Sequence, residues 1–197
     1  HPNWEIYRRD ELFPVGKNPA TDLWEFVDLR TGVAPQDFAQ KPDVHSGIQY
    51  VLLPGGEFQM GSPESEMKRK PFEDLHTTRV SPFLIAKYEL AQGIWYRLQG
   101  YRHANKFPVD LKPTAASWFD ARKLGKRLGA DLPTEAQWEY ACRAGTQTPY
   151  SASSIEDVGW YIGNSGDKLH DVGELKPNPF GLFDMHGNAN QWGYDRL

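Results

Sequence analysis

Apolar residues recur with the period of an α-helix in segment 117–129. An apolar residue returns there every three or four positions: Trp118, Ala121, Leu124 and Leu128. Ser117, with Asp120 three residues later, is typical of a helix start, and Gly129 is typical of a helix end. The basic residues of the segment fall on the opposite face, where we expect solvent: Arg122, Lys123, Lys126 and Arg127. The pattern therefore predicts an amphipathic helix.

A second, shorter helix is predicted directly afterwards. Thr134 followed by Gln137 forms a capping box, in which each side chain bonds the other residue's backbone N–H. One face of the helix that follows is apolar: Trp138, Ala141 and Cys142. Gly145 supplies the stop. We therefore expect a helix that begins at Glu135.

Two other segments have different patterns. Residues 22–29 (Asp-Leu-Trp-Glu-Phe-Val-Asp-Leu) alternate as in a strand that Thr31 and Gly32 would end. Residues 176–188 (Lys-Pro-Asn-Pro-Phe-Gly-Leu-Phe-Asp-Met-His-Gly-Asn) are apolar, but prolines and glycines interrupt them too often for a helix. We expect this second segment to be an ordered, packed loop.

The composition is that of one domain rich in turns. The 197 residues are 39% hydrophobic and 13% aromatic, and they include 18 glycines and 15 prolines. A core of ordinary size is possible, with many residues in turns. Residues 1–47 hold several aromatic side chains between prolines. We expect them to form an N-terminal extension that packs on a domain spanning residues 48–197.

Charge and hydropathy exclude some partners. A net charge of −4 gives no general field that would attract nucleic acid or anionic lipid. The chain has no apolar run near the ~20 residues that a membrane helix needs, so we expect that it is not an integral membrane protein. It also has no secretory apolar region, and it begins at His1 rather than Met. We expect a processed or trimmed start, which leaves a lost signal peptide open.

Residues 131–145 and 176–188 resemble the formylglycine-generating enzyme family, also called the sulfatase-modifying-factor domain. Its usual wording is close to Arg-Leu-Pro-Thr-Glu-Ala-Glu-Trp-Glu-Tyr-Ala and Asn-Pro-Phe-Gly-Leu-Tyr-Asp-Met. Segment 50–62 resembles the family's opening strand pair, and segment 83–95 its next strand and first helix. The resemblance covers about three quarters of the chain. It implies an α+β variant of the C-type lectin fold with two short helices, antiparallel strands and much irregular loop.

The only cysteine, Cys142, bears on the chemistry. No intrachain disulfide can form, and the position of Cys142 on an apolar helix face predicts a buried structural thiol. The resemblance implies that catalytic members bind copper(I) through two cysteines near the C-terminal end of the domain. One thiol cannot form such a site. Copper is expected only if a cysteine pair lies beyond Leu197, and we predict no catalytic residue within this chain.

The resemblance also implies a calcium turn. Where the family has Gly-Asn-Val-Trp-Glu-Trp, this chain reads Gly-Asn-Ala-Asn-Gln-Trp over residues 187–192. Carried over by position, the implied oxygen ligands are the side chains of Asp184 and Gln191 and the carbonyls of Gly187 and Ala189. In the alternative interpretation, Asp184 and Asn188 are turn residues that bond their own backbone. The sequence leaves both open. The six histidines show no metal-binding spacing.

Relatives continue beyond this motif with two closing strands, whereas this chain ends at Leu197. We therefore expect the domain to lack those strands, and we favour an incomplete sequence. The relatives include multi-domain bacterial proteins. For this chain, the sequence leaves two compartments open: the bacterial cytoplasm, or export followed by loss of a signal peptide.

Two functions follow as hypotheses. The first is a non-catalytic binding or accessory protein whose rim recognises a protein, peptide or glycan. The expected rim residues are Trp160, Tyr161, Asn190, Gln191 and Tyr194. Such a protein could be a variable protein of a diversity-generating retroelement or a subunit of a larger assembly. The alternative is the N-terminal portion of a copper-dependent oxidase that converts a substrate cysteine to formylglycine.

Overall fold

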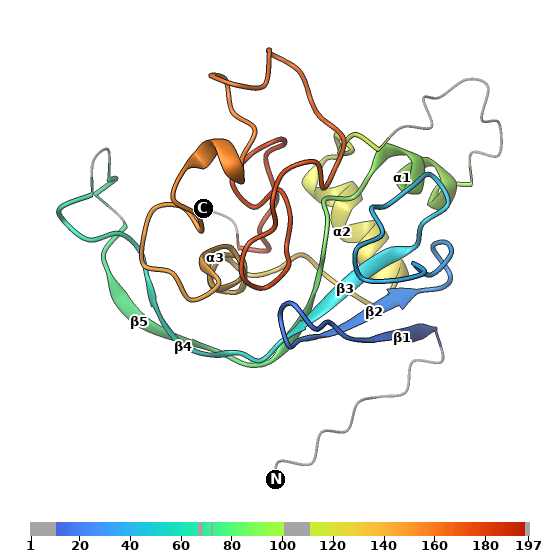
Figure 1. Cartoon of the computed structure of the whole chain (residues 1–197), viewed down its shortest axis with the longest axis horizontal. Helices are drawn as coiled ribbons and strands as arrows, with labels where there is room; N and C mark the ends of the chain where they lie inside the picture. Colours follow the sequence, from blue (N-terminus) through green and yellow to red (C-terminus); the bar gives the residue numbers. More distant parts are fainter. Residues whose placement is uncertain (1–10, 67–68, 72, 101–110, 196–197) are drawn as a thin grey trace, which may run out of the picture.

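A computed structural model describes residues 11–66, 69–71, 73–100 and 111–195 of the chain. Within these residues it has an α+β fold with antiparallel sheets, as the sequence predicted (Figure 1). The strands are β1 (Leu12–Lys17), β2 (Trp24–Asp28), β3 (Ile48–Leu53), β4 (Gly56–Met60), β5 (His76–Val80) and β6 (Phe83–Ala86). The helices are α1 (Gln92–Leu98), α2 (Trp118–Arg127) and α3 (Glu135–Arg143), followed by a 3-10 turn at Ile155–Asp157.

The strands form two sheets, and the pair β3-β6 continues into the pair β4-β5 as one long, bent ribbon (Figure 1). The larger sheet has the antiparallel order β1-β2-β3-β6, and β4 pairs with β5 in a second sheet. Both strands expected over residues 50–62 are present, as β3 and β4. They do not pair with each other: β3 pairs with β2 and β6, and β4 pairs with β5. The chain bends at Gly55, where φ is +68° and an added Cβ would lie 2.5 Å from the Val80 carbonyl oxygen. Only glycine fits this bend.

Part of the N-terminal extension is built into the larger sheet. β2 confirms the strand predicted over residues 22–29, and it pairs with β1 on one side and β3 on the other. The aromatic residues Trp4 and Tyr7 lie outside the described residues. The division of the chain at residues 47 and 48 stays a prediction.

α2 and α3 begin where the capping motifs predicted. The Ser117 hydroxyl accepts the Asp120 N–H at 3.2 Å. Thr134 and Gln137 bond reciprocally, at 3.2 Å from the Gln137 N–H to the threonine hydroxyl and at 2.9 Å from the Thr134 N–H to the amide oxygen. The sequence analysis expected two short helices. The described residues add a third, α1, at the place after β6 where the resemblance put a helix.

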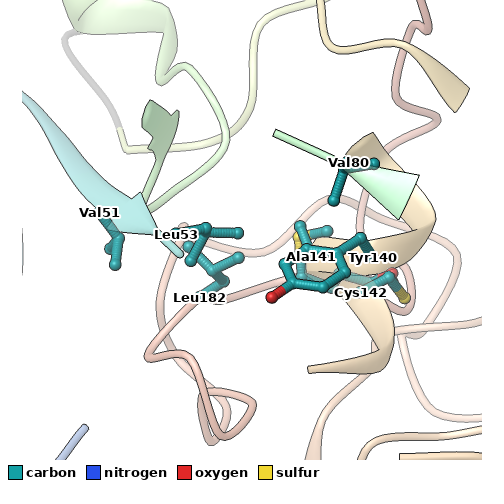
Figure 2. Close-up of a cluster of buried hydrophobic side chains, with 8 residues drawn as sticks. Val51, Leu53, Val80, Tyr140, Ala141, Cys142 and Leu182 are labelled. Carbon is teal, nitrogen blue, oxygen red and sulfur yellow. The ribbon is translucent and has the colours of Figure 1, made fainter. Parts of the chain in front are cut away.

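The main core joins the ribbon, α3 and the C-terminal loop. Its buried members are Val51, Leu53, Val80, Tyr140, Ala141, Cys142, Leu182 and Met185. Figure 2 shows Leu182 among the same side chains as Leu53 and Tyr140. Segment 176–188 contains no described helix or strand, yet Leu182 and Met185 are buried. It is the ordered, packed loop that its sequence predicted.

A buried ion pair joins the N-terminal strands to the segment after β6. The Lys87 ammonium lies 2.8 Å from Glu25 Oε2, and these two side chains are 3% and 1% exposed. Asn18 Nδ2 donates to the other carboxylate oxygen at 2.6 Å, and Lys87 also donates to the Phe38 carbonyl at 3.3 Å. Both charges are therefore paired and hydrogen-bonded, which a buried charge requires.

Candidate functional site

The candidate site is the turn formed by residues 184–195, which packs against α2, α3 and the segment after β6. Asp184 begins the turn with a left-handed backbone, φ 57°, and its side chain is buried. Its Oδ2 accepts the Gly173 N–H at 2.8 Å, whereas Oδ1 has no hydrogen-bond partner among the described residues. Burial raises the pKa of the Asp184 carboxyl to about 6. This carboxyl group is thus only partly satisfied.

Gln191 connects three parts of the fold through its amide. Trp138 Nε1 on α3 donates to Gln191 Oε1 at 2.7 Å. Gln191 Nε2 donates to the Asp184 carbonyl at 2.9 Å and to Glu89 Oε1 at 3.2 Å. The side chain is exposed at the surface, but both ends of its amide are bonded.

Three residues of the turn donate hydrogen bonds to the Glu89 carboxyl group. Besides Gln191, the Asn188 side chain donates to Glu89 Oε2 at 3.0 Å and the Ala189 N–H donates to Oε1 at 3.2 Å. Burial, and then the charge of Asp184, raise the pKa of the Glu89 carboxyl to about 8, although the donated bonds oppose this shift. Sequence reasoning missed Glu89. Its one signal was a single carboxylate in the apolar stretch that follows β6.

Two of the four implied calcium ligands, the side chains of Asp184 and Gln191, already make hydrogen bonds to other protein groups. The oxygen of Gln191 faces the Trp138 indole, and its nitrogen faces the acceptors of the turn. Within the described residues, Asp184 Oδ1 is the one side-chain oxygen of the implied set that has no hydrogen-bond partner. No cluster of three or more His, Cys, Asp or Glu side chains in the described part of the chain could hold a metal ion. Calcium itself stays a prediction of the resemblance.

Asp184 and Asn188 hold the turn to neighbouring segments. Asn188 Oδ1 accepts the His170 N–H at 2.9 Å, and its Nδ2 donates to the His170 carbonyl at 3.1 Å. The Asp184 carboxyl group accepts the Gly173 N–H from the same neighbouring segment. Both are turn residues with positive φ, as the alternative interpretation expected, but they bond the backbone of segment 170–173 rather than their own.

The expected rim residues fall into two groups. Trp160 stacks on His170 with ring centroids 3.7 Å apart, and the Tyr161 hydroxyl donates to Glu156 in the same loop. Asn190, Gln191 and Tyr194 lie on the C-terminal turn. The segments that carry the two groups are joined where the Asn188 N–H donates to the Trp160 carbonyl at 2.9 Å. The role of these five residues in binding stays a prediction.

Three residues of the C-terminal turn form an exposed patch. We call Asn190, Trp192 and Tyr194 the C-terminal patch; Trp192 is 52% exposed and Tyr194 is 43% exposed. Arg122 lies under the Tyr194 ring at 4.6 Å from its centroid, and Trp192 Nε1 donates to the Ala116 carbonyl at 2.8 Å. Sequence reasoning included Asn190 and Tyr194 but missed Trp192. Asn190 and Trp192 of this patch line a cavity of ≈ 2140 Å³, and Glu89 forms part of the same wall.

Cys142 is a buried thiol, as the sequence predicted. Its Sγ donates to the Met185 carbonyl at 3.4 Å and lies 3.7 Å from His186 Nδ1. Burial raises the pKa of the Cys142 thiol to about 12 and lowers the pKa of His186. Both groups are therefore neutral near pH 7. A reactive thiolate would need the opposite shift of the cysteine.

The described helices contain none that is long and apolar enough to cross a lipid bilayer. This finding agrees with the absence of a long apolar run in the sequence.

The chain is similar in sequence to several curated proteins and in structure to solved ones. The chain is 26% identical over 203 residues to chaperone protein LppX of Paenibacillus barcinonensis, covering 72% of this chain and 69% of that protein. The formylglycine-generating enzyme of Thermomonospora curvata is 25% identical over 72% of this chain and 69% of that protein, whereas serine/threonine-protein kinase pkn1 of Chlamydia pneumoniae is 29% identical over 75% of this chain but only 28% of that protein. The structure is similar to PvdO from Pseudomonas aeruginosa, with a TM-score of 0.66 and 27% identity over 81% of this chain and 77% of that one.

A second structural neighbour supports the fold. Treponema denticola variable protein 1 superimposes with a TM-score of 0.58 and 22% identity, covering 82% of this chain and 77% of that chain. These neighbours have the C-type lectin-like fold that the resemblance implied. The model of the sulfatase-modifying factor enzyme 1-like domain matches residues 35–197, which is most of the chain. The chain therefore belongs to the sulfatase-modifying factor enzyme 1-like domain family.

Proposed function

We propose that this domain is a non-catalytic binding or accessory member of its family. The observation that supports this most directly is the state of Cys142. It is the single cysteine of the sequence, it packs in the main core, and burial raises its pKa to about 12. A copper(I) site of the kind used by the family's oxidases needs two soft thiolates, so the residues present do not fit copper.

The C-terminal patch is the proposed binding surface for a protein, peptide or glycan. Tyr and Trp side chains supply large contact area with few rotatable bonds, and Asn supplies adaptable hydrogen bonds. The patch is fixed in place because Trp192 and Tyr194 bond the backbone of Ala116 and Pro133. One relative, LppX, is named a chaperone protein, and a chaperone acts by binding other proteins.

A narrower form of this proposal makes the domain a variable protein of a diversity-generating retroelement. Asn190 and Tyr194 would then be diversified positions, and their exposure is compatible with that role. Membership of a larger assembly is the other form. In both, the packed loops serve as a rigid frame for exposed side chains.

The alternative function is that of a copper-dependent formylglycine-generating oxidase, of which this chain is the N-terminal portion. Membership of a family named for a sulfatase-modifying enzyme favours it. Two cysteines in a continuation of the chain would supply the thiolates that residues 1–197 lack. A calcium ion at the C-terminal turn is implied by the same family resemblance.

The first experiment tests whether residues 1–197 catalyse on their own, and the alternative function is tested in the same assay with any continuation of the chain included. We expect the purified chain to leave a Cys-x-Pro-x-Arg peptide unmodified when incubated with copper(I), oxygen and a reductant, as measured by mass spectrometry. A known formylglycine-generating enzyme serves as the positive control. Conversion of the peptide by this chain, with loss of conversion in Cys142→Ser, would overturn the proposal.

Binding gives a separate prediction. Replacing Tyr194 by alanine should weaken the best ligand found on peptide and glycan arrays by about tenfold or more, as expected for an aromatic anchor. Tyr150→Ala is the matched control, since Tyr150 is 41% exposed but lies outside the C-terminal patch. Equal losses for the two variants would contradict a binding role for the patch.

A further inference from the structure

The C-terminal turn carries an amide at the position where the resemblance implies a calcium ligand. We propose that the side-chain amide of Gln191 takes the place of the cation, so that this turn is held together without a metal ion. The inference concerns how the turn is stabilised, and it is independent of whether the domain is catalytic.

The orientation of the Gln191 amide follows from its neighbour. An indole N–H can only donate a hydrogen bond, so the atom that faces Trp138 Nε1 at 2.7 Å must be the amide oxygen. The NH₂ group then faces the opposite way, toward the Asp184 carbonyl and Glu89 Oε1, at 2.9 and 3.2 Å. Both of these atoms accept hydrogen bonds. The reversed amide would place a donor against the indole and oxygen against both acceptors.

The two hydrogens of the amide match these two acceptors. A glutamate at position 191 could still accept from Trp138 with one oxygen, but its second oxygen would lie against the Asp184 carbonyl and Glu89. Three oxygens in contact require a proton or a cation between them. The glutamine therefore supplies with N–H groups the positive partial charge that a proton or a calcium ion between these oxygens would otherwise supply.

The rest of the turn is arranged in the same way. The Asn188 side chain and the Ala189 N–H also direct their hydrogens at Glu89. The donors of residues 188, 189 and 191 thus converge on one carboxyl group from the segment after β6. A calcium site needs the opposite arrangement, in which oxygens of the turn converge on a common point.

The test compares the wild-type protein with Gln191→Glu. We expect the melting temperature of the wild type to be the same in calcium chloride and in EGTA. Gln191→Glu should be destabilised in EGTA, and calcium should raise its melting temperature by about 4 °C or more. Terbium, a luminescent substitute for calcium, should be sensitised by Trp138 in this variant but not in the wild type. The double variant Asp184→Asn, Gln191→Glu should lose both responses.

Two results would overturn the proposal. One is a calcium response of the wild type that Asp184→Asn abolishes; the other is a folded Gln191→Glu protein with no calcium response. If Gln191→Glu does not fold, the side-chain amide NMR signal of Gln191 in the wild type decides. Its position should be unchanged by calcium, and a calcium-dependent shift of that signal contradicts the inference.

Discussion

Replacing Lys87 by methionine is expected to lower the free energy of unfolding by about 3–5 kcal/mol. The reason is the burial of its partner: Glu25 is 1% exposed, and the Lys87 ammonium at 2.8 Å is its charged neighbour. Methionine fills similar space but leaves the carboxylate without a positive charge in the interior. Urea denaturation followed by tryptophan fluorescence measures the change.

Two further variants separate the ion pair from its surroundings. Glu25→Leu combined with Lys87→Met should recover most of the loss, because no uncompensated charge remains and only the Asn18 amide and the Phe38 carbonyl lose these partners. Lys17→Met is the matched control. It breaks the Lys17–Asp22 pair, whose side chains are 49% and 85% exposed, and it should cost less than about 1 kcal/mol. A small loss in Lys87→Met, comparable with that of Lys17→Met, would show that the pair is not the link between the N-terminal strands and the domain.

The features that the sequence predicted well are local. The N-cap at Ser117 and the capping box at Thr134 each involve residues three positions apart, so the sequence contains the whole interaction. The packed loop over residues 176–188 was predictable as well, because its prolines and glycines exclude regular structure while its apolar side chains require burial. These local rules, together with the family resemblance, were sufficient for the fold class.

The candidate site depends on distant residues, which a single sequence does not pair. Glu89 and Gln191 are 102 positions apart, and Trp138 and Gln191 are 53 apart. The sequence singled out Gln191 as an implied calcium ligand and a rim residue, but it did not predict that the amide oxygen accepts a hydrogen bond from an indole. Similarly, Trp160 was expected at the rim, and the sequence did not predict that its half-buried ring stacks on His170. Aromatic residues in loops can bind ligands or pack, and tertiary contacts decide between these roles.

The end of α3 shows how the packed loop stabilises the fold. The last four carbonyls of a helix have no partner within the helix. Those of Tyr140 and Arg143 accept the N–H groups of Ala144 and Thr146. The two carbonyls between them, of Ala141 and Cys142, accept the side-chain amide of Asn178 at 2.7 and 3.3 Å. Asn178 therefore completes the helix from a segment 36 residues further along the chain.

Replacing Asn178 by alanine is expected to cost about 4 kcal/mol or more, because four polar groups lose their partner and each buried one costs roughly 1–3 kcal/mol. The lost partners are the two helix carbonyls and the N–H groups of Phe180 and Leu182, which Asn178 Oδ1 accepts at 3.0 and 3.1 Å. Asn164→Ala is the control. Asn164 also bonds through both ends of its amide, but in an exposed loop where water can replace it, so about 1 kcal/mol is expected. Equal losses in urea denaturation would mean that burial of the helix end, rather than its hydrogen bonds, stabilises this junction.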